Sequence, residues 1–184
     1  MDITNILGAL TSGEAANELG GKLNMQSSKV SSIINSALPM LLQGMQKNVS
    51  TQEGASALNN ALDHHAGNAG NIGGLLKNAD LTDGSKILGH IFGGNLSSMI
   101  GGLAKDNGAE TSQVSNILSS IAPSLLALLG KAKQSVNIGS DGLGAMLGTM
   151  LGGNGGSIIG KVLSDKDGDG SPDLLKGLGN IFKR

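Results

Sequence analysis

Four aspartates near the end of the sequence are the residues whose spacing best suits chemistry. The segment over residues 165–173 reads Asp-Lys-Asp-Gly-Asp-Gly-Ser-Pro-Asp. Calcium is a hard cation that binds roughly six to eight oxygen atoms, and alternating carboxylates on a turn can converge on one ion. The predicted ligands are the side chains of Asp165, Asp167, Asp169 and Asp173 and the backbone carbonyl of Ser171. The sequence therefore predicts a calcium site in this Asp-rich loop.

The order of these ligands resembles the calcium loop of EF-hand proteins, with Asp165 at its first position. A glutamate at the twelfth position completes an EF-hand site, and Lys176 stands there in this chain. This departure predicts weaker binding than in an EF-hand. An alternative reading needs no metal, because Ser171, Pro172 and Asp173 suit the N-cap and first turn of a helix. The two readings are compatible.

Three histidines and Asp63 are the other candidates for chemistry. Asp63, His64 and His65 are consecutive, and His90 stands apart. Adjacent residues on a helix point in different directions, so His64 and His65 make a poor metal pair. The chain has no cysteine and no G-x-S-x-G nucleophile motif. We predict a protein that is not an enzyme, and keep as an alternative an enzyme with a site around Asp63, His64 or His90.

The elements that must position these residues are helices. Hydrophobic residues make up 39% of the chain but aromatic residues only 1%, whereas sheets favour aromatic and β-branched side chains. Apolar residues recur at helical spacing behind the predicted N-caps Ser28 and Ser112. Pro39 and Pro123 lie inside these two patterns, where they are expected to kink or interrupt the helix. The predicted fold is all-α and multi-helical, without a sheet.

Two further helices are predicted to begin at capping boxes. The boxes pair Thr11 with Glu14 and Ser50 with Glu53, because a hydroxyl followed three residues later by a glutamate satisfies two backbone donors.

The two halves of the sequence resemble each other. The matching segments are residues 28–36 with 112–120, 39–42 with 123–126, 83–85 with 169–171, and 88–92 with 178–182. The offset grows from 84 to 90 positions while the order is kept. We interpret the chain as two tandem copies of one helical unit, residues 1–92 and 93–184. The first copy keeps the Asp-Gly-Ser turn but lacks the earlier carboxylates, so the Asp-rich loop 165–173 is particular to the second.

Glycine accounts for 31 of the 184 residues, and small residues recur at every fourth position in two runs. These runs are Gly144, Gly148, Gly152, Gly156 and Gly160, and Gly89, Gly93, Ser97 and Gly101. On a helix this spacing gathers small residues on one face, where a second helix can pack closely. We interpret the runs as internal packing and helix ends, with a dimer-forming face as the alternative. The partners predicted are another protein or a second copy of the chain.

The glycine-rich helical units resemble the YidB-like bacterial proteins, a family named as a domain of unknown function. The segment over residues 83–93 carries the most specific part of the resemblance, and the Ala-Pro-Ser-Leu-Leu turn at residues 122–126 supports it. The resemblance runs from about Asn5 to Phe182. It implies a bacterial origin and a multi-helical, homeodomain-like array, and it supplies no catalytic residues. The homeodomain-like shape makes a DNA-associated protein a further alternative.

Charge argues against nucleic acid as the partner. The net charge is −1 and Arg184 is the only arginine, whereas nucleic-acid binders usually present a basic surface. Lys131, Lys133 and Lys161 are scattered and are interpreted as solvated surface charges. No Sec-type signal peptide is visible, and the apolar stretch 117–129 is too short to span a bilayer. We therefore expect a cytoplasmic structural or interaction protein that calcium stabilises, with other export routes left open.

Overall fold

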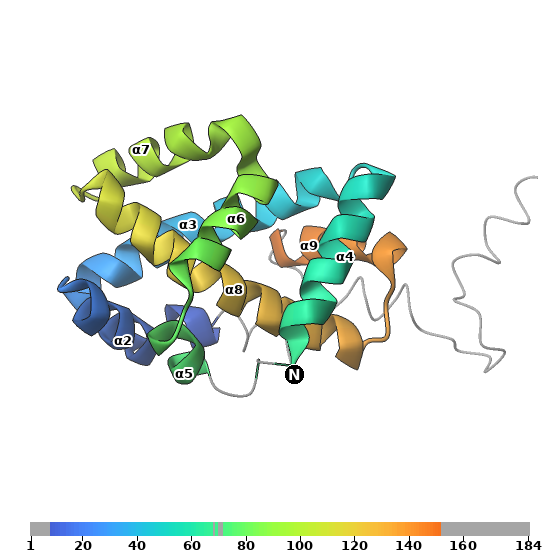
Figure 1. Ribbon diagram of the computed structural model, residues 1–184, viewed down its shortest axis with the longest axis horizontal. Helices are drawn as coiled ribbons and strands as arrows, with labels where there is room; N and C mark the ends of the chain where they lie inside the picture. The colour runs from blue at the N-terminus through green and yellow to red at the C-terminus, as the bar shows by residue number, and fades with distance from the viewer. Residues whose placement is uncertain (1–7, 68, 70–71, 152–184) are drawn as a thin grey trace, which may run out of the picture.

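The computed structural model describes residues 8–67, 69 and 72–151, and its regular elements are all helical (Figure 1). The helices are α2 (Gly13–Leu23), α3 (Ser27–Asn48), α4 (Gln52–Ala66), α5 (Ile72–Lys77), α6 (Leu81–Phe92), α7 (Leu96–Asp106), α8 (Thr111–Ser135) and α9 (Leu143–Leu151). Short 3-10 turns, η1 (Gly93–Asn95) and η2 (Ser140–Gly142), precede α7 and α9. The prediction of an all-α fold is confirmed for this part of the chain.

Helix α8 is the centre of the fold. It packs against α4 and α6 most extensively and also contacts α2, α3, α5 and α7. Its middle is buried on every side from Ile117 to Ala122. A helix that is apolar all round must lie inside a core or a membrane. Within the described ranges α8 alone is long and apolar enough to cross a membrane, and 78% of its most apolar window is buried inside the protein.

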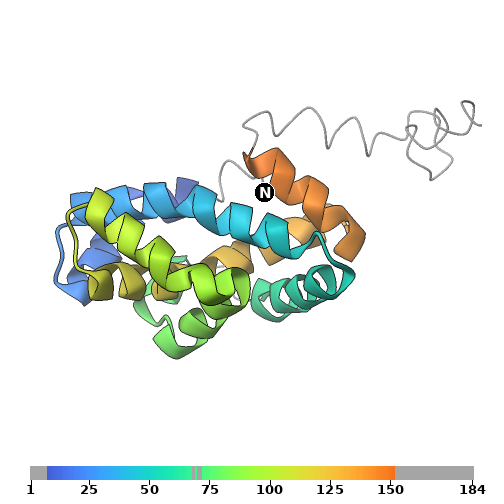
Figure 2. The ribbon, with the colours of Figure 1, turned by 90° about the horizontal axis from the view of Figure 1, so that it is seen from above.

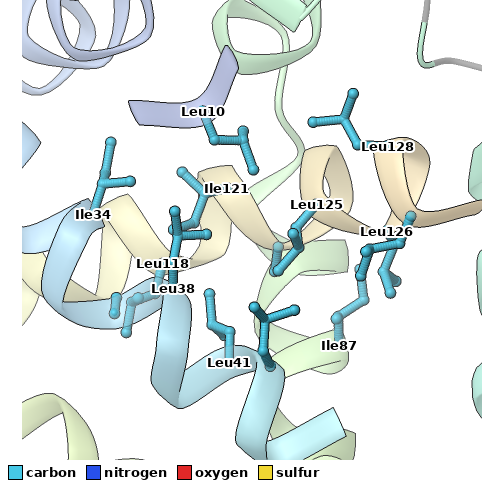
Figure 3. Packing of buried hydrophobic residues seen from close by; sticks show 14 of the residues in the cluster. Leu10, Ile34, Leu38, Leu41, Ile87, Leu118, Ile121, Leu125, Leu126 and Leu128 are labelled. Carbon is cyan, nitrogen blue, oxygen red and sulfur yellow. The ribbon is translucent and has the colours of Figure 1, made fainter. Parts of the chain in front are cut away.

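Helix α3 supplies the second wall of the core. Its buried stripe recurs at helical spacing and faces α8. Figure 3 shows Ile34, Leu38 and Leu41 of α3 close to Leu118 and Ile121 of α8. Burying a side chain of this size contributes roughly 1.5–3 kcal/mol. The apolar residues that recur along the two long helices therefore form the centre of the hydrophobic core.

The two prolines do not interrupt their helices. Pro39 lies inside α3 and Pro123 inside α8, and both helices continue past them. An internal proline removes one backbone hydrogen bond and costs about 3 kcal/mol in an isolated helix. The core contacts on both sides of each proline outweigh that cost. The predicted interruption was wrong because tertiary packing, which the local pattern does not show, keeps these helices continuous.

Predicted helix starts differ from the observed ones by one or two residues. The N-caps of α3 and α8 are Gln26 and Glu110, ahead of the predicted serines. The N-caps of α2 and α4 are Ser12 and Thr51, whose hydroxyl oxygens accept hydrogen bonds from the backbone N–H groups of Ala15 and Gly54. For α2 and α4 the neighbouring residues Thr11 and Ser50 offered equivalent hydroxyls, so the local sequence did not decide between them.

Close helix packing does not use the predicted stripe from Gly89 to Gly101, although Gly148 of the other predicted run meets α3, where an added Cβ atom would lie 3.1 Å from Gln46 Nε2. A Cβ atom added to Gly84 or Gly130 would overlap backbone atoms of a neighbouring helix. Gly89 and Gly101 of the predicted stripe meet open space instead. Gly93 ends α6 with a φ of +53°, a conformation that favours glycine. The interpretation of this stripe as a packing face was wrong, while its reading as a helix end holds at Gly93.

Helices from both predicted units share one hydrophobic core. Buried residues from Leu10 to Met150 form a single cluster. Helices α4 and α6 of the first unit pack on α8 of the second, and α9 of the second packs on α3 of the first. The helix order recurs, since an 11-residue helix precedes a long proline-containing helix at both α2–α3 and α7–α8. The duplication and its seam at residue 92 stay predictions.

Candidate functional site

The predicted calcium ligands lie outside the described residues. These are Asp165, Asp167, Asp169, Ser171 and Asp173, together with Lys176. Over the ranges that the structure does describe, no group of three or more His, Cys, Asp or Glu side chains is placed to hold a metal.

The first-half segment that matches the Asp-rich loop lies in α6, where Asp83, Gly84 and Ser85 are helical and do not form the predicted turn. Asp80 is the N-cap, and its carboxylate accepts hydrogen bonds from the backbone N–H groups of Thr82 and Asp83 at 2.8 and 3.3 Å. These two hydrogen bonds lower the pKa of Asp80. In the first half the N-cap is therefore Asp80, and Ser85, which matches the predicted N-cap Ser171, lies inside the helix.

Asp63 is part of an ion pair between α4 and α8. The Lys133 ammonium donates to its two carboxylate oxygens at 2.6 and 2.7 Å, and Asn59 Nδ2 donates at 3.2 Å. The Lys133 side chain is only 7% exposed, so its interpretation as a solvated charge was wrong. A signal for this existed, because Lys133 follows Leu126 by two helical turns and so shares its buried face.

His65 lies in an open cavity between the end of α4 and the start of α6. Its Nε2 atom is 3.8 Å from Asp83 Oδ2, and its ring meets the His64 ring edge-on at 5.0 Å. Burial lowers the pKa of His65, the Asp83 carboxylate opposes that shift, and His64 adds to it. The cavity has a volume of about 650 Å³ and is also lined by Asp80 and Lys86. Sequence reasoning had set His65 aside.

The structure does not gather Asp63, His64 and His90 into one cavity. His64 lines the cavity beside Asp83, whereas His90 lines two others near the opposite end of α6. Asp63 is held by Lys133. No observation on these residues favours the enzyme alternative.

A more apolar cavity, which we name the α4–α6 groove, runs between these two helices. Figure 1 shows α6 and α4 side by side across α8. The groove has a volume of about 490 Å³. Its lining residues are Glu53, Gly54, Ala57, Leu58 and Ala61 of α4, Ile87, His90 and Ile91 of α6, Met45 and Asn48 of α3, and Leu126 of α8. Apolar grooves of this kind bind ligands more often than flat surfaces do.

The few polar side chains of the groove differ in whether they are free to bind a ligand. Asn48 Nδ2 already donates to the backbone carbonyls of Gly44 and Ile91 at 3.0 and 2.9 Å. Glu53 and His90 are exposed. The apolar floor can thus bury an aliphatic surface, while Glu53 offers a negative charge at its edge.

Together, the fold and the groove define a compact all-helical domain with one central helix. A family described as bacterial protein of unknown function (DUF937) matches residues 5–132, and the chain belongs to this family. The match runs from before α2 to near the end of α8, so it includes the helices that α8 holds together. No curated protein and no solved structure matches the chain. The narrower likeness to YidB-like proteins and to EF-hand loops stays a prediction.

Proposed function

We propose that this protein is a non-catalytic interaction protein, and that the α4–α6 groove binds an amphipathic helix of a partner protein. The observation that carries the proposal is the apolar floor of the groove between two helices. Ala57 and Ala61 recur along its α4 wall, and small residues allow the backbone of a third helix to approach. Glu53 at the edge complements a basic residue on the polar side of that helix.

Site-specific photo-crosslinking in bacterial cells tests this proposal. A photoreactive residue at Ala57, exposed in the groove, is compared with one at Ser56, which is exposed but does not line the groove. We expect one defined partner to crosslink from position 57 and not from 56. The purified partner should then bind the wild-type protein and lose that binding with Ala61→Glu.

Two results would overturn the groove proposal. Equal crosslinking from both positions, or binding that survives Ala61→Glu, would move the interaction elsewhere. Crosslinking of the protein to itself would make a second copy the occupant and replace the partner with self-association.

Calcium stabilisation is the second part of the proposal. Side-chain oxygens of Asp165, Asp167, Asp169 and Asp173 and the Ser171 carbonyl would bind one calcium ion. Their alternation and the glycine at the turn support this, and a ligand that binds only the folded state stabilises it by mass action. Lys176 in place of the bidentate glutamate implies weak affinity.

Calorimetric titration of chelator-treated protein with calcium tests the loop. We expect saturable binding that Asp167→Ala abolishes and that Asp106→Ala, at an exposed aspartate of α7, retains. The calcium proposal is wrong if millimolar calcium produces neither heat nor thermal stabilisation. The loop would then be a helix-capping turn.

The last part of the proposal is that the protein is cytoplasmic and does not bind nucleic acid. The net charge of −1 and the single arginine support the absence of nucleic-acid binding. DNA association has in its favour only the homeodomain-like shape that the family resemblance implies, and no contact or charge pattern among the described residues supports it.

A further inference from the structure

Helix α6 docks on α8 next to Pro123. The proline has no N–H, so the Ser119 carbonyl four residues earlier lacks its usual helical donor. Gly84 of α6 lies against that carbonyl, because a Cβ atom at position 84 would overlap the Ser119 oxygen. The hydroxyl oxygens of Ser85 and Ser119 are 3.0 Å apart. A proline, a small polar residue one turn before it and an approaching Asp-Gly-Ser segment therefore make this contact.

Helix α3 carries the same features at the matching positions but leaves them uncovered. Pro39 matches Pro123, so the Asn35 carbonyl also lacks its helical donor. Asn35, Ser36 and Pro39 are all exposed. On α8 the matching Ser119 and Ser120 are 2% and 0% exposed. We name these three exposed residues of α3 the open proline face.

Each of the two long helices, α3 and α8, is packed by a helix from the other half of the chain. Helix α4 packs on α8 and α9 packs on α3. Helix α2 contacts both long helices, and so does α7. Figure 2 shows α3 and α9 on the upper side of the body and α5 and α6 on the lower side. Among the described helices, none covers the open proline face of α3 as α6 covers α8.

The sequence after α9 contains a counterpart of α6. Asp169-Gly170-Ser171 repeats Asp83-Gly84-Ser85, and residues 178–182 repeat residues 88–92. Gly84 comes 18 residues after the end of α4 at Ala66, and Gly170 comes 19 residues after the end of α9 at Leu151. The sequence after α9 is therefore long enough, and has the motif, to reach the open proline face of α3 as α6 reaches Pro123 on α8.

We propose that residues 169–182 dock on the open proline face of α3 within the same molecule. Gly170 lies against the Asn35 carbonyl, and Ser171 pairs with the Asn35 side chain as Ser85 pairs with Ser119. The contact depends on helix packing and not on metal, so it is tested in the presence of a chelator, separately from calcium binding.

Disulfide trapping tests the docking directly, because the chain has no cysteine of its own. The test variant carries Asn35→Cys with Ser171→Cys. The positive control carries Ser85→Cys with Ser119→Cys, whose hydroxyl oxygens are already in contact. The negative control carries Ser171→Cys with Asp106→Cys, at an exposed position on α7. We expect the test pair to form an intramolecular disulfide about as fast as the positive control and many-fold faster than the negative control.

A second measurement covers the case in which disulfide geometry is unfavourable. Maleimide labelling of the single variant Asn35→Cys should become several-fold faster when Gly170→Val is added, because a branched side chain prevents the close approach. Labelling of Asp106→Cys should not change. If neither trapping above the negative control nor faster labelling is seen, the segment does not dock. A disulfide that joins two chains would overturn the intramolecular arrangement in favour of an exchanged dimer.

Discussion

The buried ammonium of Lys133 holds both carboxylate oxygens of Asp63, at 2.6 and 2.7 Å, and so ties α8 to α4. The two side chains differ in exposure, 7% for Lys133 and 46% for Asp63. Removing the carboxylate leaves a positive charge in the core, whereas removing the ammonium leaves a carboxylate that water can reach. The pair is therefore asymmetric, and mutation of Asp63 should lower the free energy of unfolding by a different amount than mutation of Lys133.

Asp63→Asn should lower the free energy of unfolding by about 1–3 kcal/mol, less than for a fully buried pair because Asp63 is open to solvent. Lys133→Met keeps the apolar stem and should cost less. Chemical denaturation of both variants measures the difference. A larger loss with Lys133→Met than with Asp63→Asn would contradict the asymmetry.

The contact of Gly84 with the Ser119 carbonyl should not tolerate a side chain. Gly84→Ala is expected to destabilise the protein by about 1–3 kcal/mol or more, because α6 must move away from α8. Gly89→Ala on the same helix meets open space and should be neutral or stabilising by up to about 1 kcal/mol. Thermal unfolding compares the two variants, and equal effects would mean that the approach at Gly84 is unimportant.

His65 should make stability depend on pH. Burial lowers its pKa in the folded state below 6.5, so the unfolded chain binds more protons at mildly acidic pH. The contribution is fully present above pH 6.5 and is lost as the pH falls through the folded-state pKa. Denaturation between pH 5 and pH 7.5 should show a rise in unfolding free energy with pH. That rise should shrink in His65→Gln and persist in His90→Gln, and an unchanged rise in His65→Gln would assign it to other groups.

Asp80 should stabilise the start of α6 as its N-cap. Asp80→Ala removes the acceptor for the N–H groups of Thr82 and Asp83 and should lower the melting temperature, whereas Asp80→Asn keeps an acceptor and should lower it less. The pKa of Asp80 is lowered in the folded state, so its contribution is present above pH 3.8 and is lost as the pH falls below that value. A melting temperature of Asp80→Ala equal to that of the wild-type protein at pH 7 would show that the cap contributes nothing.

Periodicity along the chain determined the helical fold and most of the core. The apolar residues of α3 and α8 were identified as one face each, and they are buried in the structure. The sequence did not determine the N-caps of these helices or the effect of Pro39 and Pro123, because helix ends and proline tolerance depend on what packs nearby.

The ion pair and the histidine cavity could not be derived in this way. Asp63 and Lys133 are 70 residues apart, and His65 meets Asp83 only because α4 and α6 both pack on α8. The α4–α6 groove has the same origin. Each of these features joins groups that no local pattern links.

Helices α3 and α8 show which features local sequence determines and which depend on tertiary packing. Local sequence determined that both segments are helical and carry matching serines, since backbone geometry and apolar spacing act over a few residues, but not that the helices continue past Pro39 and Pro123. Only the tertiary structure decided that Ser120 is buried while Ser36 is exposed. Burial depends on which distant segment covers a face, and that is set by the packing of the whole chain.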